Sequence, residues 1–192
     1  MGFKSVVANY QLGKLRKKVQ PAQFSVPSDL LKTKHILVCL PAGLRELTLV
    51  KQFLPSISYL FNKADVTLLS VPGIQVTDIY PRKGFQIVTP SVDQMGWAGV
   101  PKKGFLTVLQ AYNFDMVIDL SMETSVFISS ILLSCPKAIR IGRGNHLGEP
   151  FYNLEIKTKY LRDERNIYRS LFETLGEVMN RRTPSLNAGG AH

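Results

Sequence analysis

Short apolar runs alternate with longer amphipathic stretches along most of the chain. Continuous apolar runs bounded by turn residues are typical of buried strands, and they occupy residues 35–40, 65–70, 114–121 and 138–142. A shorter run over 85–90 predicts another strand, whereas the alternating residues 74–81 fit either an edge strand or an extended loop. The run at 114–121, "FDMVIDLS", is the clearest strand in the chain.

Apolar residues spaced three or four apart predict helices over residues 44–62, 103–112, 124–135 and 158–180. Pro55 lies inside the first helix and is expected to kink or divide it, because proline lacks a backbone N–H. Thr124 or Ser125 is a candidate N-cap of the third helix. The last helix is expected to bury Leu161 together with later apolar residues.

Strands that alternate with helices imply a parallel sheet covered on both faces. We predict an α/β fold: a single Rossmann-like three-layer domain over residues 29–182, with a mostly parallel sheet. A basic N-terminal helix and linker over 1–28 precede the domain, and a disordered tail over 183–192 follows it. Ligands of such sheets bind beyond the carboxyl ends of the strands, so the loops of interest are 41–46, 71–73, 121–124 and 142–149.

Charge is concentrated at the N-terminus of a chain whose formal net charge is +10. Residues 1–28 contain no acid and five cations, namely Lys4, Lys14, Arg16, Lys17 and Lys18. Beside them, apolar residues recur at helical spacing: Phe3, Val7, Tyr10, Leu12, Leu15 and Val19. A basic amphipathic helix can bind lipid headgroups, RNA or the ribosome, or an acidic protein. Alternatively, it packs its apolar side on its own domain and leaves the lysines solvated.

Composition narrows the class of protein further. With 192 residues, 45% of them hydrophobic and 20% charged, the chain suits one globular domain. No apolar run approaches the roughly 20 residues that span a bilayer, and the N-terminus lacks the pattern of a signal peptide. We expect a cytoplasmic protein that can lie peripherally at the inner face of the membrane.

Cysteine and histidine spacing favours neither a metal nor a cofactor. Cys39 and Cys135 lie in apolar segments without a CxxC pair, which predicts buried thiols in a reducing compartment. His35, His146 and His192 share no ligand spacing with either cysteine. Neither GxGxxG nor GxxxxGK[ST] occurs, so no nucleotide cofactor is expected.

Two loops carry candidate site residues. In "PAGLRE" (41–46), Gly43 permits a tight turn, Arg45 follows, and Glu46 lies near a helix N-terminus. Glu46 can act there as a general base in a cleft, or only complement the helix dipole. In the glycine-rich loop within "RIGRGNHLGEPFYN" (140–153), four polar residues can converge on a ligand: Arg143, Asn145, His146 and Glu149.

Both candidate regions have a structural interpretation that needs no ligand. The 140–153 segment can be a solvated loop with Phe151 and Tyr152 in the core. Asp119 ends an apolar strand and must find a partner there, and capping the next helix is favoured over catalysis.

Three segments resemble the N-terminal half of the heptosyltransferases of glycosyltransferase family 9. "HILVCLPAGLREL" resembles the family's opening strand and its "S-L-G-D-V" turn. "YNFDMVIDLSMETSVFISSILLSCPKAIRIG" resembles its "Y-D-L-V-I-D-L-Q…S…L…A…R-I-G" strand–helix–strand, and "GEPFYN" resembles its "R-E-P…Y-N" stretch. Together these segments cover roughly residues 34–153 in the expected order.

The resemblance implies a bacterial protein related to enzymes with two Rossmann-like domains. The N-terminal domain binds the lipopolysaccharide acceptor, the C-terminal domain binds the nucleotide-sugar donor, and an aspartate in the "G-D" turn serves as base. The matching position is Glu46, with Arg45 in place of the glycine, and the following "L-P" falls three residues later, at Leu54–Pro55. About 40 residues follow the matched region, so we expect no donor-binding domain.

Two functions from different classes follow. We favour a stand-alone, non-catalytic relative of the acceptor domain that binds an anionic partner through its basic arm. The alternative is half of a glycosyltransferase, which a partner chain completes with a donor-binding domain; Glu46 would be the base, and Arg143 and His146 would contact an anionic acceptor. A homo-oligomer is a third possibility for the assembly.

Overall fold

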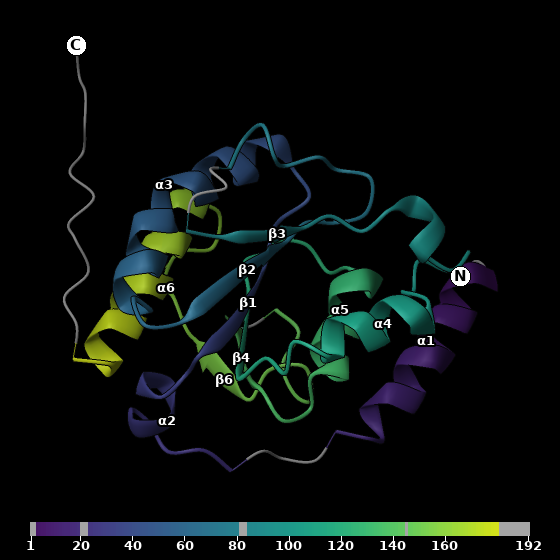
Figure 1. Cartoon of the computed structure of the whole chain (residues 1–192), viewed down its shortest axis with the longest axis horizontal. Coiled ribbons are helices and arrows are strands. Elements are labelled where there is room, and N and C mark those ends of the chain that lie inside the picture. The colour runs from purple at the N-terminus through teal and green to yellow at the C-terminus, as the bar shows by residue number, and fades with distance from the viewer. Residues whose placement is uncertain (1–2, 20–22, 81–83, 145, 181–192) are drawn as a thin grey trace.

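Six parallel strands form one sheet in the computed structural model, which describes residues 3–19, 23–80, 84–144 and 146–180 (Figure 1). The strands are β1 (His35–Cys39), β2 (Asp65–Leu69), β3 (Gln86–Val88), β4 (Met116–Asp119), β5 (Ile139–Arg143) and β6 (Leu154–Ile156). Their order across the sheet is β3-β2-β1-β4-β5-β6, and every pair is parallel. This is the Rossmann order, in which the direction of winding reverses between β1 and β4.

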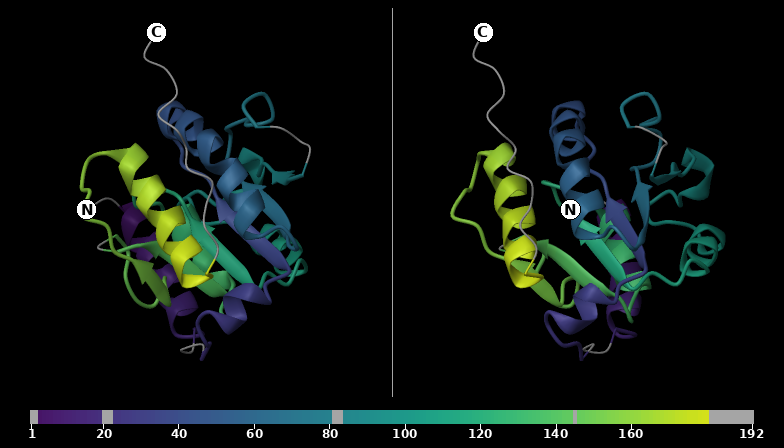
Figure 2. Two further views of the ribbon diagram at one scale, coloured as in Figure 1. Left: turned by 90° about the vertical axis from the view of Figure 1, so that its left-hand side faces the viewer. Right: turned by 60° about the vertical axis from the view of Figure 1, so that its left-hand side comes forward.

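Helices cover both faces of the sheet, as a parallel sheet requires. The helices are α1 (Phe3–Arg16), α2 (Ser28–Leu31), α3 (Leu44–Leu60), α4 (Lys103–Gln110), α5 (Val126–Ser134) and α6 (Glu164–Val178). α3 and α6 pack together on one side, whereas α1 and α4 both contact α5 on the other (Figure 2). The predicted three-layer α/β fold is therefore confirmed.

Side chains of the central strand β1 alternate between two apolar cores. Ile36 and Val38 of β1 join the core under α3 and α6. Leu37 and Cys39 join the core under α4 and α5, which also contains Leu12 of α1. The period of two along the strand thus divides one apolar run between two helical layers.

Several details differ from the sequence-based prediction. Pro55 lies inside α3 without dividing it. Residues 74–80 form turns and loop, so the loop alternative was correct there, whereas residue 81 lies outside the described residues. The strand β6 was not predicted, and Leu161 is 79% exposed because α6 begins only at Glu164.

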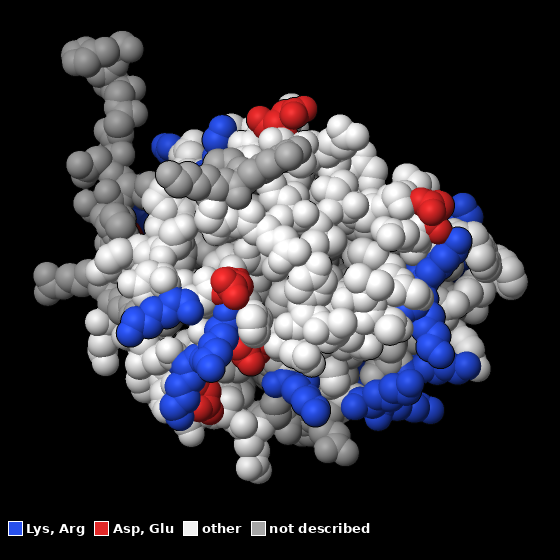
Figure 3. Space-filling view, in the orientation of Figure 1, with Lys and Arg blue, Asp and Glu red and all other residues white. Residues whose placement is uncertain are grey.

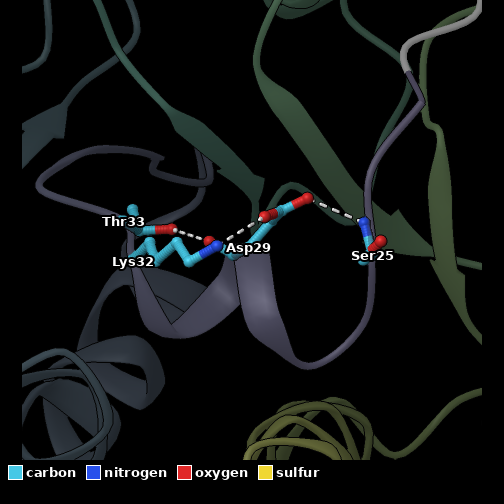
Figure 4. A network of polar contacts seen from close by, with 4 residues as sticks. All are labelled: Ser25, Asp29, Lys32 and Thr33. Carbon is cyan, nitrogen blue, oxygen red and sulfur yellow. Dashed lines mark hydrogen bonds and ion pairs between the residues drawn. The ribbon is translucent and has the colours of Figure 1, made fainter.

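The segment between α1 and β1 is organised around Asp29 at the start of the short helix α2 (Figure 4). The Asp29 carboxylate accepts a 2.7 Å hydrogen bond from the backbone N–H of Ser25 and lies 3.7 Å from Lys32 Nζ. The Asp29 carbonyl accepts a hydrogen bond from the Thr33 hydroxyl. Asp29 thereby fixes the turn that leads into the sheet.

The N-terminal helix packs on the domain, which was one of the two alternatives for it. Ala8 and Leu12 are buried, and α1 contacts α5. The apolar positions expected to form one side of the helix are divided, however, because Phe3 and Tyr10 are exposed.

The part of the chain that the structure describes contains no helix with the length and apolarity needed to cross a membrane.

Arg140 is a buried cation that holds the loops around β5. Its side chain is 2% exposed, and its guanidinium donates hydrogen bonds to the backbone carbonyls of Cys135, Pro136, Ala138, Pro150 and Phe151. A buried carbonyl that loses its donor costs free energy, because no water replaces the bond. Arg140 therefore ties the end of α5 to the segment that precedes β6.

We predict that Arg140→Met lowers the free energy of unfolding by about 3 kcal/mol, because several buried carbonyls lose their partner. Urea denaturation followed by circular dichroism measures the change. Arg162→Met is the control, since Arg162 is exposed and should leave stability nearly unchanged. Equal stability of the two variants would show that the Arg140 contacts contribute little.

Candidate functional site

A cavity of about 470 Å³ lies beyond the carboxyl ends of β1 and β4, where the direction of winding reverses. It is lined by the loop after β1 (Pro41, Ala42, Gly43, Glu46), by Val71 after β2, and by the loop and helix after β4 (Ser121, Met122, Glu123, Thr124, Ser125, Ile128). Three of the four loops predicted from the sequence therefore meet at one cavity. The fourth, 142–149, contributes no lining residue.

Gly43 and Glu46 lie together at one wall of this cavity. Gly43 is the N-cap of α3 and has no side chain to cap the helix. The Glu46 carboxylate folds back over it, so closely that a Cβ on Gly43 would collide with the carboxylate. A negative charge is favoured at this position, because the first N–H groups of a helix are unpaired and its dipole is positive there.

Arg45 does not reach the cavity. Its side chain is 78% exposed, and its guanidinium lies 3.2 Å from the Glu164 carboxylate at the start of α6. The prediction that Arg45 binds a ligand together with Gly43 and Glu46 thus finds no support in the lining of this cavity.

Hydroxyl groups line the opposite wall. Ser125 caps α5, and its Oγ accepts a hydrogen bond from the Ile128 N–H at 3.5 Å. Ser121 and Thr124 also line the cavity. Carboxylate and hydroxyl groups around a partly apolar cavity suit a polar ligand that carries hydroxyl groups.

Asp119 organises the loop that carries this second wall. Its side chain is 2% exposed. One carboxylate oxygen accepts hydrogen bonds from the Ser121 N–H at 2.9 Å and from the Ser121 hydroxyl at 2.6 Å. The other accepts a 2.6 Å bond from the Tyr152 hydroxyl. The expectation that Asp119 caps the next helix was wrong: it closes the turn at Ser121, and Ser125 is the cap.

Burial raises the pKa of both members of this pair. It raises the pKa of Asp119, and the hydrogen bonds from Ser121 and Tyr152 counteract part of that rise. Burial also raises the pKa of Tyr152 well above its usual range, and the Asp119 charge adds to the effect. Tyr152 therefore remains a hydrogen-bond donor to Asp119 at any physiological pH.

Arg143 and His146 lie behind the cavity wall. The Arg143 guanidinium donates a 3.2 Å hydrogen bond to the Met122 carbonyl and lies 3.5 Å from His146 Nδ1. Burial lowers the pKa of His146, the Asp119 charge raises it, and Arg143 lowers it. Arg143 therefore supports the loop that contains Met122, and His146 lies beside Arg143.

The remaining predicted loop residues do not join this cluster. Glu149 is exposed and does not line the cavity, and Asn145 lies outside the described residues. Among the described residues, no group of three or more His, Cys, Asp or Glu side chains is arranged to hold a metal ion. Cys39 and Cys135 are buried free thiols, as predicted, and burial raises the pKa of Cys135 to about 11.

Sequence reasoning missed the roles of Ser121 and Tyr152. Tyr152 was expected only as a core residue, and it is indeed 1% exposed. The sequence did contain one signal, a glycine within a predicted buried strand. In the structure this Gly142 faces Tyr152, and a Cβ there would collide with the tyrosine ring. A glycine within a buried strand indicates a close approach of this kind.

We predict that Tyr152→Phe lowers the free energy of unfolding by about 1–3 kcal/mol near neutral pH, because the Asp119 carboxylate loses a donor. The folded pKa of Asp119 lies above its unfolded value. The cost of burying its charge is therefore present above the folded pKa and is relieved as the pH falls through it. The destabilisation should thus be smaller at an acidic pH below the folded pKa than near pH 7.

Urea denaturation at the two pH values measures this difference. Tyr80→Phe is the matched control, because the buried Tyr80 hydroxyl donates to the Leu47 carbonyl, which does not titrate. The control should lose stability equally at both pH values. A Tyr152→Phe effect that is independent of pH would contradict the assignment.

Comparison with known proteins supports the fold. No family model matches the chain, and no curated protein matches it. The solved structures that resemble it include two of Escherichia coli heptosyltransferase WaaC, with ADP and with ADP-2-deoxy-2-fluoro heptose. Each has a TM-score of 0.55 and 16% identity and covers 80% of this chain, with 49% and 50% of WaaC covered.

A glycosyltransferase family 9 protein from Veillonella parvula has a TM-score of 0.54 at 14% identity, covering 91% of this chain and 46% of its own. The chain thus spans about half the length of these structures. The resemblance to glycosyltransferase family 9 that the sequence segments carried is present in the structure, and what the chain shares with these proteins is the fold.

Proposed function

We propose that this protein is a binding module of glycosyltransferase-like fold that attaches to an anionic partner through the basic helix α1. The observation that carries the proposal is the orientation of α1. The helix packs inward through Ala8 and Leu12. Its predicted partner-binding cations Lys4, Lys14 and Arg16, and Lys17 and Lys18 just after it, are all exposed.

Lys14 and Lys17 lie on the solvent side of α1, opposite the buried Ala8 and Leu12, whereas Lys4 and Arg16 lie at the flanks of the helix. Figure 3 shows Lys and Arg side chains gathered along the side of the molecule where Figure 1 places α1. Lys14 Nζ lies 4.5 Å from the Tyr10 ring centre, and the Arg16 guanidinium lies 4.7 Å from that of Phe151. No ion pair found among the described residues involves α1.

The N-terminal segment itself carries no acid that would balance these cations. Residues 1–28 contribute five of the ten net positive charges of the chain, and none of these residues is acidic. Such a field attracts polyanions and headgroups, and the attraction weakens as salt increases.

The residues at positions 45 and 46 favour a binding role over catalysis. Glu46 lies against the N-terminus of α3, and Arg45, which replaces the family's glycine, pairs with Glu164 outside the cavity. Both positions of the family's "G-D" turn therefore carry a different residue in this chain. The cavity would bind a ligand, and α1 would locate the protein on its partner.

We predict that changing Lys4, Lys14, Lys17 and Lys18 to Gln weakens binding to heparin, which serves here as a generic polyanion. The dissociation constant at low salt should rise about tenfold or more, because each removed charge weakens the attraction. Heparin-column elution and fluorescence titration at two salt concentrations measure the change.

The control removes the same charge elsewhere. Lys34, Lys51, Lys63 and Lys137 are exposed, and changing all four to Gln should alter heparin binding much less. If both variants lose affinity equally, net charge alone is responsible and α1 is not the binding surface. If the unaltered protein does not bind heparin, the proposed function is wrong.

A second candidate function is half of a glycosyltransferase, completed by a partner chain with a donor-binding domain. One observation favours it: Glu46 faces a cavity of about 470 Å³ that also presents hydroxyl groups. A carboxylate in such a position can accept a proton from an acceptor hydroxyl. Some of the structurally similar proteins are heptosyltransferases solved with ADP or an ADP-sugar analogue.

We predict that the chain releases no ADP from ADP-heptose, either alone or when added to a cleared lysate of the native host. Coupled detection of ADP measures the release. Release that depends on the added chain, is lost in Glu46→Gln and persists in Glu123→Gln would overturn the non-catalytic assignment. Glu123 is the control because it lines the same cavity.

A further inference from the structure

We propose that the anionic partner of α1 is a phospholipid bilayer, on which the protein lies through the solvent side of the helix and the adjacent Trp97. This inference rests on the proposed function, because it identifies the partner of the same cationic surface. It adds an apolar contribution that binding to a simple polyanion does not require.

Helical geometry gives α1 two apolar sides. At about 100° per residue, Phe3, Val6 and Tyr10 lie opposite the buried Ala8 and Leu12. Their side chains are 76%, 55% and 64% exposed. The inner side is sufficient to pack α1 on α5, so the outer residues are not explained by the fold.

The outer side of α1 continues onto a second segment. Trp97 is 57% exposed, and its ring stacks on Phe3 with 5.6 Å between ring centres. Its loop is closed by an antiparallel bridge between Met95 and Pro101 and by a 2.8 Å hydrogen bond from the Gly96 N–H to the Val100 carbonyl. The loop therefore presents Trp97 from a defined position beside α1.

We call the exposed residues Phe3, Val6, Tyr10, Lys14, Lys17 and Trp97 the outer face. It joins aromatic side chains to lysines on one side of the molecule. Aromatic rings partition into the headgroup region of a bilayer, and lysines beside them are attracted to anionic lipids. Both contributions are present on the same helix, and the inner apolar side keeps that helix attached to the domain.

The chemistry of the outer face favours lipid over RNA. Its six residues have aromatic, aliphatic or lysine side chains. The Asn, Gln and Arg side chains of α1, which are the types that read base edges or hold phosphates with paired hydrogen bonds, are Asn9, Gln11 and Arg16, and they lie outside this face. Arg16, the only arginine of α1, lies over the Phe151 ring instead. Lysines and exposed apolar groups bind without a specific pattern of hydrogen bonds, which suits the fluid surface of an anionic bilayer.

The chain carries its own reporter of this contact. Trp97 is its only tryptophan, so its fluorescence reports the outer face alone. We expect its emission to shift to shorter wavelength and become protected from acrylamide when vesicles of phosphatidylcholine and phosphatidylglycerol are added. Vesicles of phosphatidylcholine alone should give a much smaller change, and poly(U) RNA should give no shift to shorter wavelength.

A variant that loses apolar side chains but keeps every charge separates lipid binding from polyanion binding. Phe3→Ser with Tyr10→Ser keeps every cation, and both positions are exposed, so the fold should persist by circular dichroism. Its dissociation constant for phosphatidylglycerol vesicles should rise about tenfold or more, whereas its heparin binding should be unchanged. The control Leu44→Ser with Leu161→Ser alters two equally exposed apolar residues elsewhere and should bind vesicles normally.

The outcomes distinguish this inference from the function on which it rests. If the protein binds heparin or poly(U) but not the anionic vesicles, the bilayer is the wrong partner and the anionic-binding function stands. Vesicle binding unaffected by Phe3→Ser with Tyr10→Ser also overturns the bilayer proposal. If the protein binds none of these probes, the proposed function fails as well.

Discussion

A parallel sheet with apolar side chains on both faces must be covered on both faces, and this constraint organises the whole molecule. α3 and α6 cover one core, while α4 and α5 cover the other. α1 completes the second layer by placing Ala8 and Leu12 against it. Because the inner side of α1 is committed to the core, its cations and its outer aromatic residues necessarily face solvent. The need to cover the sheet thus leaves the basic solvent side of α1 exposed, and the proposed function depends on that surface.

The same topology creates the cavity. The winding reverses between β1 and β4, so the loops that follow these strands diverge and leave space between them. Asp119 shapes one of these loops through Ser121, and the hydroxyl of Tyr152, in the segment before β6, donates a hydrogen bond to Asp119. The site is therefore built on a buried carboxylate that never reaches the cavity itself. Glu46, which does reach it, is held at the N-terminus of α3.

Local pattern predicted the parts of the fold in which apolar spacing is unambiguous. The buried strands, the amphipathic helices and the meeting of the 41–46 and 121–124 loops followed from that spacing and from strand–helix alternation. The short strand β6 was missed because Glu155 interrupts its apolar residues, whereas the equally short β3 lies within a longer apolar run. The division of α1 into two apolar sides depends on where α5 lies, and the partnership of Tyr152 with Asp119 joins residues 33 apart in sequence. Long-range contacts of this kind leave no periodic signal in the chain.

Amide hydrogen exchange of α1, read in the free protein and on phosphatidylglycerol vesicles, tests the central claim most directly. That claim is that α1 is already folded and packed on α5 and presents a preformed surface. The account predicts that the amides of residues 6–15 are protected in the free protein to a degree similar to those of α5, and that vesicles add little. Exchange of α1 at the rate of an unstructured peptide in the free protein, with protection only on vesicles, would contradict it.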